Sequence, residues 1–90
     1  MYTREFEWDE AKRELSLLKH GLDFTEVTHL DWDNAIIRPD RRIDYGEARF
    51  QAFALWDGRL FQVTFTPRGS AIRIVSFRPA NRKERKFYGA

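Results

Sequence analysis

The sequence contains no cysteine and no long apolar run. Disulfide bonds and thiolate chemistry are therefore excluded, and no stretch of about 20 apolar residues is available to span a bilayer. The first residues also lack the basic and then apolar pattern of a secretory signal. We expect a cytoplasmic protein that does not contact a membrane.

Metal ligands and nucleophile motifs are equally scarce. The sequence has only two histidines, His20 and His29, and without cysteine they make no recognisable zinc spacing. Asp31 and Asp33 could coordinate a hard cation, although two acidic residues at a helix end are ordinary. No glycine-rich phosphate loop and no serine elbow occurs. We expect no metal site and no cofactor.

Aromatic residues, in contrast, are plentiful. Of the 90 residues, 42% are hydrophobic and 16% are aromatic, which is far more than a disordered chain carries. A chain of this length can build one hydrophobic core. We therefore expect one domain that covers residues 1–90.

Charge is distributed unevenly along the chain. Residues 1–57 carry eight Lys or Arg and thirteen Asp or Glu, a net charge of −5, whereas residues 58–90 carry eight Lys or Arg and one Glu, a net charge of +7. This asymmetry predicts a basic surface that faces a polyanion. The alternative is a basic surface that only favours solubility.

The first third of the chain predicts a strand and two helices. Residues 4–8 alternate polar and apolar, as in a short strand. Asp9 is the expected N-cap of a helix that ends at Gly21. Its apolar stripe, expected to face the core, is Ala11, Leu15, Leu18 and Leu22. A second, short helix is predicted from Asp23 to about Leu30.

A hairpin is the clearest β signal. Two alternating runs, residues 47–56 and 59–66, flank Asp57-Gly58, the preferred pair for a type I′ turn. Such a turn predicts the pairs Trp56–Arg59, Ala54–Phe61, Ala52–Val63 and Phe50–Phe65. We also predict a short strand over residues 35–38 and a charged, mobile loop over residues 39–46.

The last quarter predicts a strand followed by a helix. Residues 71–77 form the third strand of a meander, and regular alternation places Arg78 on the face of Ile72 and Ile74 with Arg73 on the opposite face. A short helix is expected from Pro79 to Tyr88, docked through Ala80 and Phe87. The fold class is α+β: two N-terminal helices, an antiparallel meander of about four strands, and one short C-terminal helix.

Arginine chemistry is what the sequence offers for a polyanion. Arginine holds phosphate oxygens bidentately and stays charged at any ordinary pH. Cleaving RNA without a metal requires a base, cations beside the phosphate and an acid, and the available proton handlers are His20, Glu47 and Tyr88. Each candidate has a plainer alternative: Arg73 and Arg78 could each pair with an acid, His20 could cap a helix, and Tyr88 could dock.

Several blocks of the sequence resemble the BrnT family, the toxins of type II toxin–antitoxin systems, which are related in fold to the RelE-like ribonucleases. The blocks run in order along nearly the whole chain. They are Phe6-Glu-Trp-Asp9, Ala11-Lys12, Lys19-His-Gly21 with Phe24, Gly46-Glu47 with Arg49, Arg73-Ile74, Ser76, Arg78, Ala80, Glu84-Arg85 and Tyr88.

The resemblance implies a metal-independent endoribonuclease that inhibits translation and growth. It also implies a BrnA-like ribbon-helix-helix antitoxin that neutralises the toxin, with operator DNA bound only through the complex. The expected catalytic residues are His20, Glu47, Arg68, Arg78 and Tyr88, and the expected RNA-binding residues are Lys19, Arg73, Arg82 and Arg85. The alternative is a non-catalytic corepressor module that binds an antitoxin or nucleic acid.

Three positions depart from the family's usual residues. Ser16 stands where the family usually has Asn, Phe77 where a small residue is usual, and Pro79 where Lys is common. Pro79 removes a cation and a backbone donor beside Arg78, and an aromatic ring at Phe77 could stack on a base. These departures predict attenuated or altered cleavage.

Overall fold

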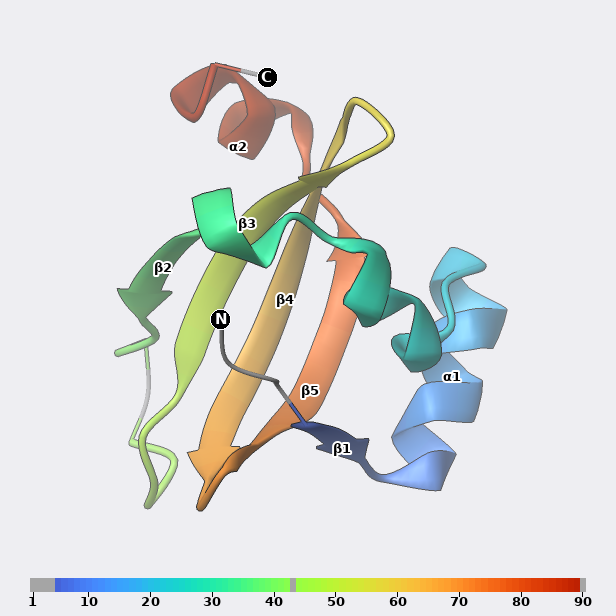
Figure 1. The fold of residues 1–90 in the computed structure, drawn as a ribbon, viewed down its shortest axis with the longest axis vertical. Coiled ribbons are helices and arrows are strands. Elements are labelled where there is room, and N and C mark those ends of the chain that lie inside the picture. The colour runs from blue at the N-terminus through green and yellow to red at the C-terminus, as the bar shows by residue number, and fades with distance from the viewer. Residues whose placement is uncertain (1–4, 43, 90) are drawn as a thin grey trace.

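The computed structural model describes residues 5–42 and 44–89, and its centre is a five-stranded sheet in the order β1-β5-β4-β3-β2 (Figure 1). The elements are β1 (Glu5–Trp8), α1 (Glu10–His20), η1 (Phe24–His29), η2 (Trp32–Asn34), β2 (Ile36–Pro39), β3 (Phe50–Trp56), β4 (Arg59–Arg68), β5 (Ala71–Pro79) and α2 (Arg82–Phe87). Among the described residues, no helix is long and apolar enough to cross a membrane.

The sheet confirms the α+β class and the predicted meander, but it is mixed and has one more strand than expected. β2, β3, β4 and β5 pair antiparallel, whereas β1 pairs parallel with the first half of β5. The prediction of about four antiparallel strands was therefore wrong at the β1 edge. Which strand a four-residue segment joins depends on distant residues, and the local pattern of residues 4–8 does not contain that information.

The hairpin follows the predicted register. Trp56 pairs with Arg59, and the remaining predicted pairs of β3 and β4 are all present. Asp57 and Gly58 have φ of 51° and 75°, the left-handed values that a type I′ turn requires. This register places the apolar side chains of Ala52 and Val63 on one face, where both are fully buried.

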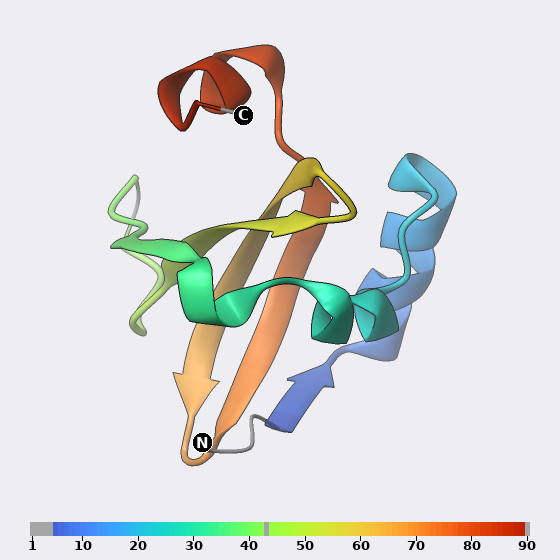
Figure 2. The ribbon, with the colours of Figure 1, turned by 45° about the horizontal axis from the view of Figure 1, so that its top comes forward.

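The core lies between that face of the sheet and the segment of η1 and η2, which crosses it in Figures 1 and 2. Phe24, Val27 and Trp32 of this segment are buried, and the indole nitrogen of Trp32 donates to the Val27 carbonyl at 2.8 Å. The predicted second helix is thus a 3₁₀ helix, with Asp23 as its N-cap. The buried side chains of η1 and η2, and not those of α1, cover this face of the sheet.

α1 begins and ends as predicted, but its orientation was not predicted correctly. Asp9 accepts the first-turn N–H groups, and Gly21 ends the helix with a φ of 67°. Leu15 and Leu18, expected in the core, are 65% and 85% exposed, whereas Ser16 is the buried residue of the helix. α1 lies beside β5 rather than over the sheet (Figures 1 and 2), so Leu15 and Leu18 face solvent, whereas Leu22, just after the helix, packs against the core.

A bulge in β5 changes which side chains share a face. Ser76 pairs with Thr64 and Ile74 pairs with Phe65, which leaves Val75 without a partner in β4. The extra residue shifts the alternation by one, so that Arg73 and Arg78 lie on the same face of the sheet. The prediction that they lie on opposite faces was wrong because it assumed an unbroken strand.

α2 begins later than predicted. Pro79 still belongs to β5, where it pairs with Phe61. Asn81 is the N-cap and forms a capping box with Glu84. Of the two residues expected to dock, Ala80 is buried ahead of the helix, whereas Phe87 is 75% exposed.

Tyr88 performs the docking instead. It packs on a second, smaller cluster of Phe53, Leu60 and Ala80, on the sheet face opposite the main core. Its ring stacks on Phe53 with 4.5 Å between the ring centroids. The plainer alternative for Tyr88, a docking aromatic, is therefore what the structure contains.

Candidate nucleic-acid interface

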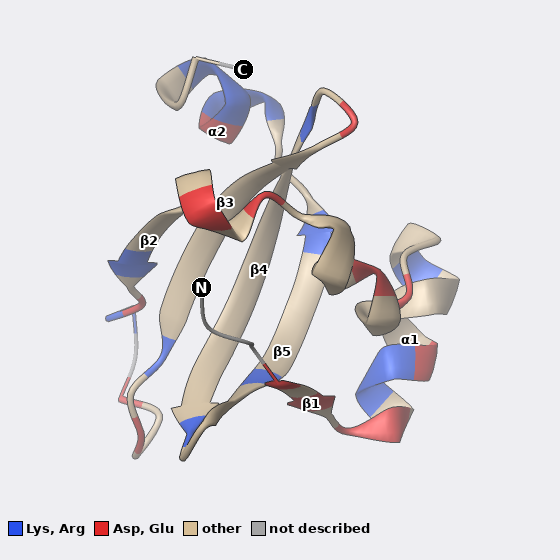
Figure 3. Ribbon diagram, in the orientation of Figure 1, with Lys and Arg blue, Asp and Glu red and all other residues tan. Residues whose placement is uncertain are grey.

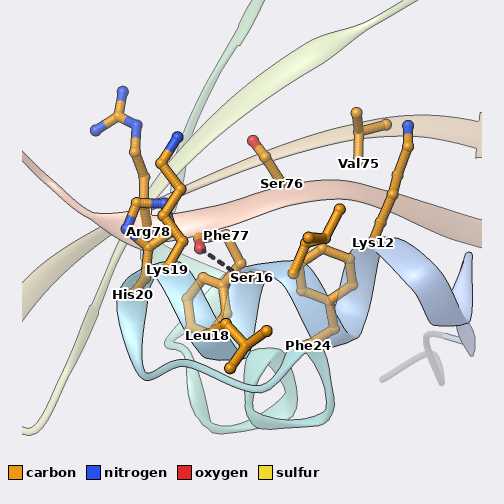
Figure 4. A pocket seen from close by; sticks show the side chains of 11 residues that line it. Lys12, Ser16, Leu18, Lys19, His20, Phe24, Val75, Ser76, Phe77 and Arg78 are labelled. Carbon is orange, nitrogen blue, oxygen red and sulfur yellow. Dashed lines mark hydrogen bonds between the residues drawn. The ribbon is translucent and has the colours of Figure 1, made fainter.

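A groove of about 560 Å³ lies between α1 and the second half of β5. Lys12, Lys19 and His20 line it from α1, and Ser76 and Arg78 line it from β5. Figure 4 shows the side chains of Lys19 and Arg78 pointing toward the same side. Among the described residues that line the groove none is acidic, so the groove is a site of positive potential. We call it the α1–β5 groove.

The α1–β5 groove exists because Ser16 fixes α1 against the edge of β5. Its hydroxyl oxygen lies 3.3 Å from the carbonyl oxygens of Phe77 and Leu22 and can donate to either. Lys12 and Lys19 stand one turn before and after Ser16 on the same side of the helix. Ser16 is thus a structural residue at the base of the groove.

Phe77 is not available for a nucleic-acid base. Its side chain is 1% exposed and packs on Phe61, with 5.6 Å between the ring centroids. The bulge at Val75 turns this side chain into the main core. The suggested stacking of Phe77 on a base was therefore wrong.

Arg78 has a partner on α2. Its two terminal nitrogens donate to the two carboxylate oxygens of Glu84 at 2.7 and 3.0 Å. These hydrogen bonds lower the pKa of Glu84 below its usual range. The pair also joins β5 to α2, because Glu84 accepts from the N–H of the N-cap Asn81.

The sheet face opposite the main core carries a polar strip that continues from the groove. Arg73, Ser76 and Arg78 of β5 lie beside Thr66, Thr64 and Gln62 of β4, in that order. A guanidinium nitrogen of Arg73 lies 3.6 Å from a carboxylate oxygen of Glu7 in β1. The bulge thus brings both arginines of β5 onto one side of the sheet, where Arg78 lines the groove.

Tyr88 lies away from the groove on the same side of the sheet. Phe53, on which it stacks, pairs with Gln62, and Gln62 pairs with Arg78. Tyr88 also follows Glu84, the partner of Arg78, by one turn of α2, and its N–H donates to the Glu84 carbonyl at 3.0 Å. The only described side chain within hydrogen-bond distance of its hydroxyl is Arg38, at 3.4 Å.

Glu47 and Arg68 lie at the opposite end of the sheet and contact each other at 3.3 Å. Arg68 pairs with Ala71, seven residues before Arg78 along β5, which corresponds to roughly 20 Å. Glu47 and Arg68 therefore cannot act on a phosphate bound in the α1–β5 groove.

The loop that follows β2, at this same end of the sheet, is held by the buried carboxylate of Asp40. Asp40 accepts two guanidinium hydrogen bonds from Arg42, at 2.9 and 2.8 Å, and one from the Tyr45 hydroxyl at 3.2 Å. The Arg42 hydrogen bonds lower the pKa of Asp40 to about 2. Arg49 completes the cluster, with its guanidinium 3.9 Å from the centroid of the Tyr45 ring.

The remaining predicted RNA contacts are on α2. Arg82 and Arg85 are exposed, and Arg85 donates to the Ala80 carbonyl at 2.9 Å. Figure 3 shows basic residues on α2, on α1 and along the strands, and acidic residues on β1 and in the segment of η1 and η2. The acidic half of the sequence thus supplies the layer that covers the main core.

The structure brings together three of the predicted site residues, Lys19, His20 and Arg78, and adds Lys12 and Ser76. The spacing of Lys12 and Lys19, seven residues apart on one helix, was visible in the sequence. Ser76 was not identifiable as a site residue, because its orientation depends on the bulge that precedes it.

A family model identifies the class to which the chain belongs. Among the described residues, no three His, Asp or Glu side chains lie close enough together to hold a metal ion. No curated protein matches the chain. A family model described as "Ribonuclease toxin, BrnT, of type II toxin-antitoxin system" matches residues 8–84. The chain therefore belongs to the BrnT family of ribonuclease toxins of type II toxin–antitoxin systems.

Proposed function

We propose that this toxin cleaves RNA in the α1–β5 groove without a metal ion. The observation that carries the proposal is the convergence of Lys12, Lys19, His20 and Arg78 on one groove lined by no described acidic residue. The phosphodiester backbone of RNA is a polyanion that such a basic site attracts. We place the scissile phosphate between Lys19 and Arg78.

His20 is the proposed general base. An imidazole can accept a proton near neutral pH, and His20 lines the same groove as the cations. It takes the proton of the 2′-hydroxyl, and the 2′-oxygen attacks the phosphorus. The bond to the 5′-oxygen then breaks and leaves a 2′,3′-cyclic phosphate. The departing 5′-oxygen takes its proton from water or from the Lys19 ammonium group.

The basic side chains supply the electrostatic stabilisation. The phosphorane carries an additional negative charge, and cations placed in advance beside it lower its free energy. We assign this role to Lys19 and Arg78, and we assign binding of the neighbouring phosphate to Lys12. Arg73 extends this path along β5, and Arg82 and Arg85 extend it on α2.

We infer that the biological consequence is arrest of translation and growth, because cleaved messages cannot be translated. A BrnA-like ribbon-helix-helix antitoxin would neutralise the toxin and carry the complex to operator DNA. Both statements rest on membership of the family and are proposals for this chain.

The experiment is cleavage of a labelled RNA by the purified toxin in EDTA. We expect fragments with 2′,3′-cyclic phosphate ends at an unchanged rate when EDTA is added. A matched RNA with a 2′-O-methyl group at the cleaved position should remain intact, because it lacks the attacking hydroxyl. Loss of cleavage in EDTA with recovery in Mg²⁺, or cleavage of the methylated RNA, would contradict the mechanism.

A further inference from the structure

α1 presents a leucine pair to solvent beside the α1–β5 groove. Leu15 and Leu18 both line it and are 65% and 85% exposed. Val75, the bulged residue of β5, lines it as well. Large apolar side chains exposed side by side at a concave site are typical of a protein contact surface.

The charges around these leucines indicate the character of the partner. Lys12 and Lys19 flank them on α1, Arg78 stands on β5, and no described residue lining the groove is acidic. A second copy of the same basic groove would be repelled. The complementary occupant is a segment that combines apolar side chains with Asp or Glu.

We propose that the α1–β5 groove is the docking site of an acidic, amphipathic segment of the antitoxin. This inference rests on the proposed function. The apolar side chains of the segment cover Leu15 and Leu18, and its carboxylates pair with Lys12 and Lys19. The antitoxin then occupies the groove in which the phosphate binds, so RNA and antitoxin compete for the same cations.

The chain offers a matched control surface. Phe87 on α2 is 75% exposed and lies outside the groove lining. A variant at Phe87 removes a comparable exposed apolar side chain without touching the proposed contact.

The test measures the Kd of the antitoxin for the unmodified toxin and for its variants. The antitoxin is purified after co-expression and is then separated from the toxin. Leu15→Gln with Leu18→Gln keeps the helix and its charge and should raise the Kd by at least about tenfold. Phe87→Gln should leave the Kd within about twofold. Phe87→Gln should also leave RNA cleavage without antitoxin unchanged, because Phe87 lies outside the groove lining.

Competition provides the second readout. A 2′-O-methyl RNA should displace the antitoxin, and Lys12→Gln with Lys19→Gln should weaken both ligands. An unchanged Kd for the leucine variant, a larger effect from Phe87→Gln, or simultaneous binding of RNA and antitoxin would each overturn the proposal. Failure of the proposed function is distinguishable, because the unmodified toxin would then bind the antitoxin but leave RNA intact.

Discussion

Glu84 holds both terminal nitrogens of Arg78, at 2.7 and 3.0 Å, and so places a carboxylate beside the proposed phosphate site. The pair positions the arginine, but it also offsets the positive charge. Arg78 is therefore a structural link to α2, and we expect it to be a partly neutralised phosphate ligand.

Glu84→Gln separates these two roles. The amide keeps an acceptor for the Asn81 N–H but loses the charge, so we expect the free energy of unfolding to fall by about 1–2 kcal/mol. Affinity for RNA should rise several-fold, because the charge of Arg78 is no longer offset. Fluorescence anisotropy with a 2′-O-methyl RNA measures the affinity, and urea unfolding measures the stability. A folded variant with weaker RNA binding would contradict this reading of Arg78.

Tyr88 tests whether a side chain outside the lining of the α1–β5 groove takes part in catalysis. Tyr88→Phe removes the hydroxyl but keeps the ring on Phe53, so we expect cleavage and stability close to those of the unmodified toxin. Tyr88→Ala removes the stacked ring and should lower the free energy of unfolding by about 2 kcal/mol. If Tyr88→Phe instead lost cleavage by about 100-fold or more, Tyr88 would be the general acid. The proposal that water or the Lys19 ammonium group protonates the departing 5′-oxygen would then be wrong.

Asp40 predicts a pH-dependent contribution to stability. Its pKa falls from 3.8 to about 2 on folding, so the stabilisation is complete above pH 3.8 and is lost as the pH falls through 2. Arg42 is 67% exposed, and solvent screening reduces the contribution to about 1–2 kcal/mol. The stability difference between the unmodified chain and Asp40→Asn should therefore shrink from pH 6 to pH 2. A difference that stays constant over this range would refute the assignment.

Local signals in the sequence were sufficient for the hairpin and for the ends of α1. Asp57-Gly58 fixes the turn, and the turn fixes the register of every pair beyond it. Asp9 and Gly21 determine the helix ends through their own side chain and backbone conformation. These features depend on residues within a few positions of one another.

The bulge and the placement of α1 depend on distant residues and were not predictable in the same way. Nothing in residues 71–79 indicates that Val75 has no partner in β4. The periodicity of α1 shows an apolar stripe, but it cannot show that η1 and η2 occupy the sheet first. Both missed features shape the site: the bulge aligns Arg73 with Arg78, and the displaced helix forms the groove.

The most direct test of the account is the single-turnover rate of RNA cleavage in EDTA for His20→Ala and Arg68→Ala. Both remove one exposed basic side chain, but His20 lines the α1–β5 groove and Arg68 lies roughly 20 Å from Arg78. The account predicts a loss of about 100-fold or more for His20→Ala and a rate within about twofold for Arg68→Ala, because Arg68 lies too far from the groove to contact the scissile phosphate. Full activity of His20→Ala, or an equal loss in Arg68→Ala, would contradict the assignment of catalysis to the groove.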